Sequence, residues 1–264
     1  MKVVLVQFEE AGKRYFFDPL DFIIEPNSFV VVETVRGVEI GKAISEKNIT
    51  EEELIAELKP IIRIANEDDL KINEYNKALE VDIVKKTKEL VFSNNLEMKV
   101  LGAEYTLDRK KLMIYFEAEG RVDFRDLVKD LSDIFKTRIE LRQVGPRDGA
   151  KMIGSIGPCG FLLCCSTFMG QFDTVSIKMA KNQNISINTA KISGLCGKLL
   201  CCIKYEDDAY TELKKELPSI HEIIIVNNEE AIVIEVEYFK KKVKARLSNG
   251  DVVLLLDGQY KRKE

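Results

Sequence analysis

The chain of 264 residues lacks tryptophan, has a single histidine, and contains no cysteine outside the segment from Cys159 to Cys202. A single histidine excludes mechanisms that need two or more, and a Ser-His-Asp triad would have to use His221. This histidine follows Pro218 at the start of an expected strand region, which favours a structural or surface role over a catalytic one.

Long apolar runs are also missing. No stretch reaches the roughly 18–20 apolar residues that a membrane helix needs. The short apolar start is followed at once by Glu9 and Glu10, unlike a secretory signal peptide. We therefore expect a cytoplasmic protein, in which clustered thiols indicate a metal or redox site rather than disulfides. The net charge of −4 argues against a dedicated nucleic-acid binder, although lysines outnumber acids around the cysteines.

The six cysteines form two near-copies of one pattern, Cys-Gly-x-Leu-Leu-Cys-Cys, which we call the first cysteine repeat (residues 157–165) and the second cysteine repeat (residues 194–202). Adjacent side chains point in different directions on a strand or helix, so the two members of a Cys-Cys pair do not easily bind one ion. One member of each pair therefore also suits a small buried apolar role. The candidate metal ligands are Cys159, Cys164, Cys165, Cys196, Cys201 and Cys202.

Four thiolates, from the first cysteine of each repeat and one member of each pair, suit either structural zinc or an iron–sulfur cluster. The four-residue spacer lies at the edge of the range for zinc and also occurs in plant-type iron–sulfur proteins, so spacing leaves the two open. The leucines at 162–163 and 199–200 are expected to form an apolar wall. Thiol redox chemistry at the adjacent pairs is a further alternative, but Cys-x-x-Cys and a nearby histidine are missing.

The order of elements predicts an α+β fold with four parts. Residues 1–59 form a β-rich domain that ends in a short helix starting at Thr50 to Glu53 and closed by Pro60. Residues 146–206 form a glycine-rich metal-binding module with a short helix within 174–184. Residues 207–264 form a charged linker helix and a β-rich, SH3-like domain. The two terminal segments are barrel-like, and either two barrels or one split barrel fits the pattern.

Residues 60–145 have the clearest periodicity. Two amphipathic helices are expected, the first over Asn66–Asn95 and the second capped at its start by Asp123. The order is β-α-β-β-α-β, which is the ferredoxin-like, split-βαβ topology and implies no cluster in this part. The expected strands cover residues 61–65, 97–107, 111–119 and 138–144.

The cysteine repeats and their surroundings resemble the PSP1-domain family of the YaaT/RicT type. The resemblance covers roughly residues 1–215, is most specific over 120–206, and shows no departure at the cysteines. It is carried by Gly120–Val128, Arg138–Gln143, Ile156–Phe168, Val175–Lys181 and Lys191–Glu206.

This resemblance implies a non-enzymatic adaptor protein. Members of the family join two small helical proteins, of the RicA/RicF type, in a complex that carries [4Fe–4S] clusters. The complex works with membrane-anchored endoribonuclease Y in mRNA maturation, and in spore formers it also affects sporulation, competence and biofilm development. The alternative is a zinc-stabilised RNA-binding module, which the basic cysteine region favours and the acidic total disfavours.

Overall fold

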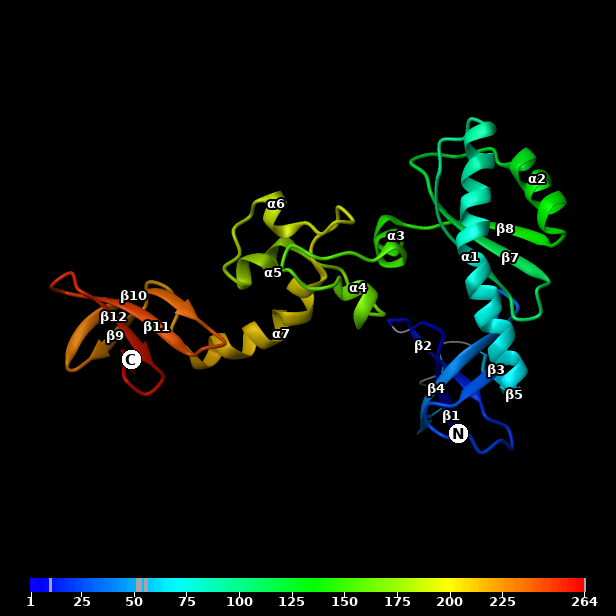
Figure 1. Cartoon of the computed structure of the whole chain (residues 1–264). Helices are drawn as coiled ribbons and strands as arrows, with labels where there is room; N and C mark the ends of the chain where they lie inside the picture. The colour runs from blue at the N-terminus through cyan, green and yellow to red at the C-terminus, as the bar shows by residue number, and fades with distance from the viewer. Residues whose placement is uncertain (10, 51–53, 55–56, 264) are drawn as a thin grey trace. The chain divides into compact units, whose positions relative to one another are not determined.

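The computed structural model describes residues 1–9, 11–50, 54 and 57–263. The helix start expected at Thr50 to Glu53 falls largely on residues outside these ranges. The chain divides into two compact units, one formed by residues 1–172 with 195–197 and the other by residues 173–194 with 198–264. Figure 1 gives the order of the elements along the chain.

The N-terminal strands close into a barrel with the strand order β1-β2-β5-β3-β4. Alternating β-branched residues produce these strands, because one side of each strand faces the barrel interior. That interior contains Val4, Val6, Val30 and Val32, each at most 1% exposed. The strands are β1 (Lys2–Gln7), β2 (Arg14–Asp18), β3 (Phe29–Glu33), β4 (Val38–Asn48) and β5 (Lys59–Ile64).

Strand β5 differs from the expectation. We expected it to start the ferredoxin-like domain, but it pairs in parallel with β2 and antiparallel with β3 inside the barrel. Its Ile61 is fully buried in the barrel core. The ferredoxin-like sheet is therefore not observed, because the strand that would complete it instead closes the barrel. The barrel also extends past the expected boundary at residue 59.

The second layer of this unit is a three-stranded sheet with the order β6-β7-β8, where β6 and β7 are antiparallel and β7 and β8 are parallel. Two helices bury their apolar sides against it, and the core includes Leu112, Ile114, Leu127 and Leu131, all fully buried. We call this assembly the α/β layer. Its elements are α1 (Glu67–Ser93), β6 (Lys99–Tyr105), β7 (Lys111–Glu117), α2 (Arg125–Phe135) and β8 (Arg138–Gln143).

The two helices begin in different ways. Asn66 caps α1: its side chain accepts from the Asp69 N–H at 2.9 Å, and the Asp69 carboxylate accepts from the Asn66 N–H at 2.9 Å. The expected cap of α2 by Asp123 is wrong, because the N-cap is Phe124 and has no side-chain cap bond. The Asp123 carboxylate instead forms an ion pair with the Arg125 guanidinium at 2.6 Å.

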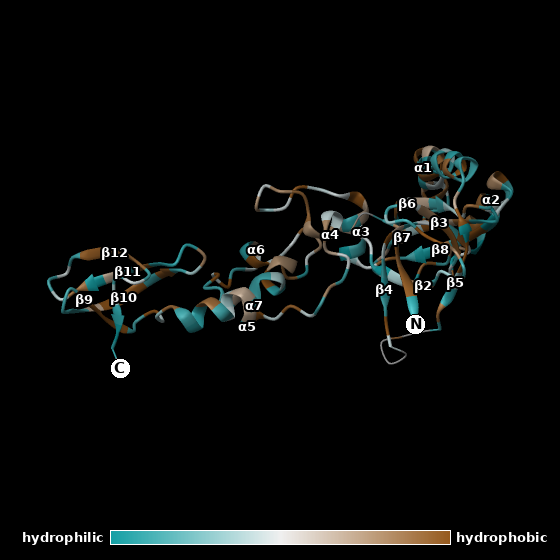
Figure 2. Ribbon diagram, turned by 90° about the horizontal axis from the view of Figure 1, so that it is seen from below, coloured by the Kyte–Doolittle hydropathy of each residue, from teal (hydrophilic) through white to brown (hydrophobic). Residues whose placement is uncertain are grey.

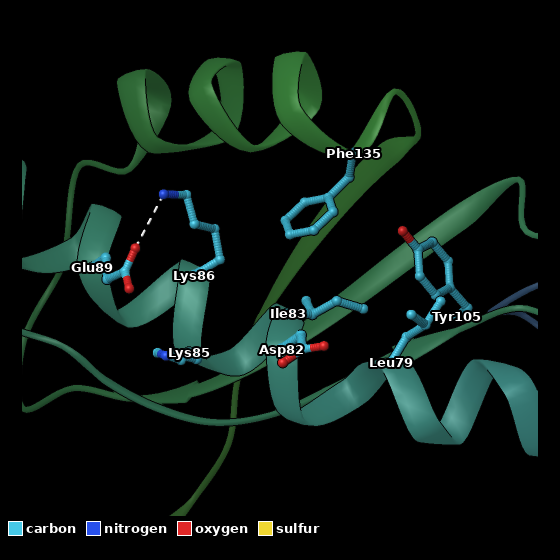
Figure 3. A pocket seen from close by; sticks show the side chains of 8 residues that line it. All are labelled: Leu79, Asp82, Ile83, Lys85, Lys86, Glu89, Tyr105 and Phe135. Carbon is cyan, nitrogen blue, oxygen red and sulfur yellow. Dashed lines mark hydrogen bonds and ion pairs between the residues drawn. The ribbon is translucent and has the colours of Figure 1, made fainter.

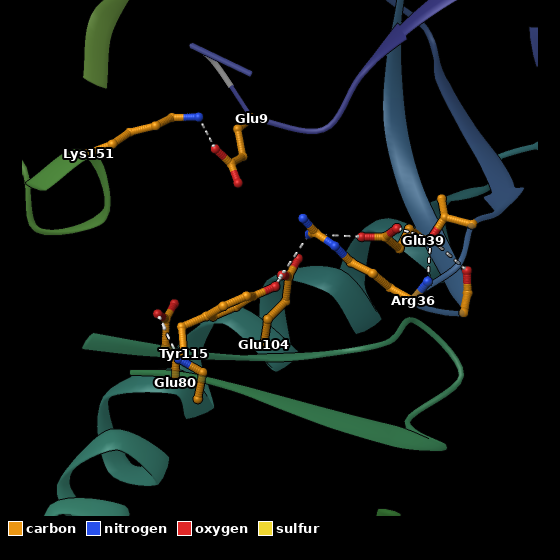
Figure 4. A network of polar contacts seen from close by, with 10 residues as sticks. Glu9, Arg36, Glu39, Glu80, Glu104, Tyr115 and Lys151 are labelled. Atoms are coloured by element: carbon orange, nitrogen blue, oxygen red, sulfur yellow. Dashed lines mark hydrogen bonds and ion pairs between the residues drawn. The ribbon is translucent and has the colours of Figure 1, made fainter. Parts of the chain in front are cut away.

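A polar network joins the barrel to the face of the sheet opposite the helices (Figure 4). Arg36, between β3 and β4, lies 3.6 Å from both Glu39 and Glu104. The Tyr115 hydroxyl donates to Glu104 at 3.0 Å. Burial raises the pKa of Tyr115, and the Glu104 carboxylate raises it further, so the hydroxyl keeps its proton. These contacts link the two layers of the unit.

The second unit contains short helices and a C-terminal sheet. The expected helix within 174–184 is observed as α5, whereas the linker helix α7 begins earlier than expected, at Cys201 instead of residue 207. The C-terminal strands form an open sheet with the order β12-β11-β10-β9-β13, separate from the N-terminal barrel. These elements are α5 (Ile177–Asn182), α6 (Thr189–Ile192), α7 (Cys201–Glu216), β9 (Ile223–Val226), β10 (Glu229–Glu237), β11 (Lys242–Leu247), β12 (Val252–Leu256) and β13 (Lys261–Arg262).

Helix α1 carries both hydrophilic and hydrophobic residues, as the colours in Figure 2 show. Among the described helices, none combines the length and apolar character that a membrane span requires.

Candidate metal centre

The first cysteine repeat is a tight hairpin that leads into a helical turn. Ile156 and Leu162 form an antiparallel bridge, and the Gly157 N–H donates to the Phe161 carbonyl at 2.7 Å. The Leu163 N–H donates back to the Ser155 carbonyl at 3.0 Å. The helical turn α4 (Cys164–Thr167) then starts at the Cys-Cys pair.

The second cysteine repeat has the same backbone structure. Ser193 and Leu199 form the bridge, and the Gly194 N–H donates to the Lys198 carbonyl at 2.8 Å. The Leu200 N–H donates to the Ile192 carbonyl at 2.9 Å, and helix α7 starts at Cys201. Every hydrogen bond named here has its counterpart in the first repeat, so the duplication in sequence is also a duplication in structure.

One glycine in each repeat is required by the backbone. Gly160 has φ of +85° and Gly197 has φ of +73°, a region that L-residues with a side chain rarely adopt. A Cβ atom at either position would meet open space, so the requirement comes from the backbone and not from crowding. The glycine directly after the first cysteine of each repeat therefore permits the turn that presents that cysteine.

The cysteines occupy equivalent positions but differ in exposure. Cys159 and Cys196 lie in the two turns, the first exposed and the second half-buried. Cys164 and Cys201 begin their helices, and both are half-buried. The second members of the pairs, Cys165 and Cys202, are 6% exposed and half-buried, respectively. All six, which the structure describes, are thiols and not disulfides.

The first repeat is anchored to its own unit by helix α3 (Pro146–Ile153), which contacts α4, β6 and β7. The Arg147 guanidinium lies 4.8 Å from the Phe172 ring centroid, and Lys151 forms an ion pair with Glu9 at 2.6 Å (Figure 4). A Cβ atom at Gly170 would lie 2.6 Å from the Gly12 carbonyl oxygen, so the chain after the repeat packs tightly on the N-terminal domain.

The second repeat rests on a small core of its own. Ala180, Ile192 and Ile203 are buried together, and Leu199 and Leu200 pack against them. The Gln183 side-chain amide donates to the Ile203 carbonyl within this core. The expected apolar wall is thus partly present: Leu199 and Leu200 support this core, whereas Leu162 of the first repeat is 63% exposed.

Thiolate donors suit zinc or an iron–sulfur cluster, and the repeated hairpins provide two equivalent sets of them. Among the described residues, however, no three His, Cys, Asp or Glu side chains lie together as ligands of one ion. Each repeat places its first cysteine in a turn and its adjacent pair at the start of a helix. We therefore keep the six-cysteine ligand set as a prediction.

A hollow of about 380 Å³ lies elsewhere, in the α/β layer, and includes none of the predicted ligands (Figure 3). Leu79 and Ile83 of α1, with Tyr105 and Phe135, give it an apolar floor, and charged α1 side chains such as Glu89 form its rim. The residues around it offer no paired catalytic groups beyond an ordinary surface ion pair between Lys86 and Glu89 at 3.0 Å.

Sequence reasoning missed the exposed apolar side chains in the first repeat and just after it. Phe161 is 77% exposed and Phe168 is 56% exposed. The glycines around Phe161 were a usable signal, because a glycine-rich segment offers little continuous core in which a large side chain could be buried. A cluster of exposed large apolar residues is typical of an interaction surface.

Comparison with known proteins gives a consistent family. The PSP1 C-terminal conserved region matches residues 59–144, and the third domain of PSP1-like proteins matches residues 174–217. The chain is 51% identical over 253 residues to the stage 0 sporulation protein YaaT of Bacillus subtilis, covering 96% of this chain and 92% of that protein. It is also 54% identical over 46 residues to protein PSP1 of Saccharomyces cerevisiae, covering 17% of this chain and 6% of that protein. No solved structure gave a significant match.

Proposed function

The chain belongs to the PSP1 family, and from this we propose that it is a non-enzymatic regulatory adaptor that carries an iron–sulfur cluster. It acts as one subunit of a complex with two small helical proteins of the RicA/RicF type. The complex works with endoribonuclease Y in mRNA processing and, in spore formers, in sporulation, competence and biofilm development. The observation that carries the proposal is the duplicated cysteine hairpin.

The hairpins support metal binding through their chemistry. Each hairpin presents one thiol from a turn and two from the start of a helix. The two hairpins have the same backbone hydrogen bonds although different parts of the chain surround them. Four thiolates satisfy a [4Fe–4S] cluster, which leaves two of the six cysteines for a partner or for packing. Cys165, at 6% exposed, is the one best suited to packing.

The adaptor role is supported by the exposed side chains beside these thiols. Phe161 and Leu162 within the first repeat, and Phe168 just after it, are each more than half exposed. Reduced thiolates in the cytoplasm oxidise when they stay accessible, so a partner that covers the repeat would protect them. The sporulation role is supported by the name of the Bacillus subtilis relative, which covers nearly the whole chain.

The decisive experiment is an anaerobic purification with an ultraviolet–visible spectrum and with iron, sulfide and zinc analysis. A brown protein with absorbance near 400 nm and matching iron and sulfide supports the proposal. A colourless protein with stoichiometric zinc would overturn the cluster. Changing Cys164, Cys165, Cys201 and Cys202 to serine one at a time tests the shared site. At least one change should weaken partner co-purification while the melting temperature stays unchanged.

A zinc-stabilised RNA-binding module is the second candidate, because one kind of side chain favours it. Lys178, Lys181, Lys191 and Lys198 are all exposed in the segment around the second repeat. Lysines of this kind bind phosphates, and their contribution falls steeply with salt. RNA binding by the isolated chain that weakens as salt rises, together with stoichiometric zinc, would favour this candidate.

A further inference from the structure

Strand β12 (Val252–Leu256) lies at one end of the C-terminal sheet, and within the described part of the chain it pairs with β11 alone. We propose that this edge is a docking site for an extended partner segment that alternates apolar and polar residues and carries lysine or arginine at its ends. The segment would add to the sheet as a further strand. This interface is separate from the cysteine repeats and does not depend on the function proposed above.

The edge presents a row of aliphatic side chains. Val252, Leu254 and Leu256 are 50%, 59% and 49% exposed, whereas Leu255 between them is buried in the sheet core. In Figure 2 this strand is drawn in the colours of apolar residues. Edge strands are usually protected by charged side chains or proline, and β12 has neither within its bounds.

The main-chain hydrogen bonds show which groups face outward. The Asp251 carbonyl accepts from the Leu247 N–H at 2.9 Å, so residues 251, 253 and 255 direct their polar groups toward β11. By the alternation of an antiparallel ladder, Val252, Leu254 and Leu256 direct theirs to the open edge. The same residues therefore offer both the apolar side chains and the hydrogen-bonding groups.

One end of the edge is closed by the chain itself. The Leu256 N–H donates to the Gln259 Oε1 at 2.8 Å, and the Leu256 carbonyl accepts from the Gln259 N–H at 3.1 Å. The open groups are thus those of Val252 and Leu254, which limits an added strand to a short pairing. A short pairing needs side-chain contacts as well as main-chain bonds, and the aliphatic row supplies them.

The charges at the ends of β12 favour a partner with basic ends. Asp251 precedes the strand and Asp257 follows it. Antiparallel pairing of the whole apolar row with that of a second copy would place Asp251 opposite Asp257, and directly opposed like charges are destabilising. A foreign strand with lysine or arginine at these positions would form attractive pairs instead.

The test uses the full-length chain and a short labelled peptide in which valines alternate with threonines between terminal lysines. Fluorescence anisotropy should detect binding, and amide hydrogen exchange should show new protection at Val252 and Leu254. Leu254→Lys should weaken the peptide's affinity by about tenfold or more, because it removes a buried aliphatic contact from the interface. Since Leu254 is exposed, the variant should fold like the parent chain by circular dichroism.

Matched controls distinguish binding at the β12 edge from non-specific hydrophobic binding. Ile232 is paired with Arg246, which in turn is paired with Val252, so Ile232 lies on the same face of the sheet as Val252. Its side chain is 49% exposed, but it belongs to the central strand β10 and not to the edge. Ile232→Lys should leave peptide binding unchanged, and a peptide with terminal glutamates should bind more weakly. Gln259→Ala should strengthen binding by releasing the Leu256 N–H.

Three results would overturn the proposal. One is equal binding of the lysine-ended and glutamate-ended peptides. Another is the absence of binding by a chain that is folded. The last is self-association, measured by analytical ultracentrifugation, that Leu254→Lys abolishes, because a second copy would then be the occupant.

Discussion

The α/β layer and the cysteine repeats are stabilised in different ways. The layer has a continuous core of fully buried aliphatic residues between two helices and a sheet. The second cysteine repeat rests on a core of only three fully buried residues, and the first on contacts with its neighbours. We infer that apolar burial is sufficient to stabilise the layer, whereas the repeats need metal binding by their thiols for full stability. The following predictions test this difference, from the largest expected effect to the smallest.

Replacing a turn cysteine should have the largest effect. Cys159→Ser and Cys196→Ser should each remove most of the bound metal, because a four-thiolate site cannot close with three, and structural thiolate sites contribute on the order of 10 kcal/mol. Metal analysis after anaerobic purification measures this loss. Ser155→Ala, in the same hairpin but without a ligand, is the control. Full metal content in either cysteine variant would contradict the pseudo-symmetric site.

A core substitution in the α/β layer should act on stability and leave metal binding alone. Leu127→Ala removes a fully buried side chain from α2 and should lower the free energy of unfolding by about 2–5 kcal/mol. Urea unfolding followed by circular dichroism measures it, and Leu127→Met should cost much less because it conserves volume. Chelator should leave hydrogen exchange in this layer unchanged. Loss of protection there on chelation would refute the independence of the two regions.

The junction of barrel and layer should respond to pH. Asp69→Asn should cost about 1–2 kcal/mol, because Asp69 takes part in the capping box and pairs with Arg63. The hydrogen bonds from the Arg63 side chain lower the pKa of Asp69 in the folded state. The contribution is therefore present above the unfolded pKa of about 4 and is lost as pH falls through the lower folded value.

Thermal unfolding of the parent and the Asp69→Asn variant across acidic pH measures this difference. The gap between them should shrink below about pH 4. Asp68→Asn, an exposed neighbour in the same helical turn, should show little change at any pH. A gap that stays constant down to the acid limit would contradict the role of the Asp69 charge.

The glycines of the two repeats should give the smallest effect. Gly160→Ala and Gly197→Ala should each cost about 1 kcal/mol, since alanine is strained at positive φ even where space is open. Gly120 also has open space around it but no positive φ, so Gly120→Ala is the matched control and should be neutral. Melting curves of the metal-bound chain measure all three. Equal changes in melting temperature at the three sites would contradict a requirement for glycine at positive φ.

Local signals predicted the parts of the fold that local physics decides. The two helices of the α/β layer and the strands expected over 97–107 and 111–119 follow from local periodicity, and all are observed. Asp123 shows the limit of such signals: Arg125, two residues on, competes for the carboxylate with an ion pair. The short helix expected within 174–184 is also present, as α5.

Sheet membership could not be predicted, because it depends on partners far away in the sequence. The residues of β5 read equally well as the first strand of a split-βαβ unit or as the last strand of a barrel. β5 joins the barrel because the edges of β2 and β3 are available to pair with it, and the sequence of residues 61–65 contains no information about those edges. For the site, the repeat predicted equivalent thiols, but not that Cys165 would be more buried than Cys202.

The position of β5 also has a consequence for synthesis on the ribosome. β5 is the last barrel strand to be made, yet it inserts between β2 and β3, so the barrel stays open until residue 64 has left the exit tunnel. The next residues to emerge are Ala65, the Asn66 cap and the first turn of α1, which includes the Asp69 partner of Arg63. Closure of the barrel thus coincides with nucleation of helix α1. If the ribosome pauses before this point, the nascent chain carries an incomplete barrel with unpaired strand edges.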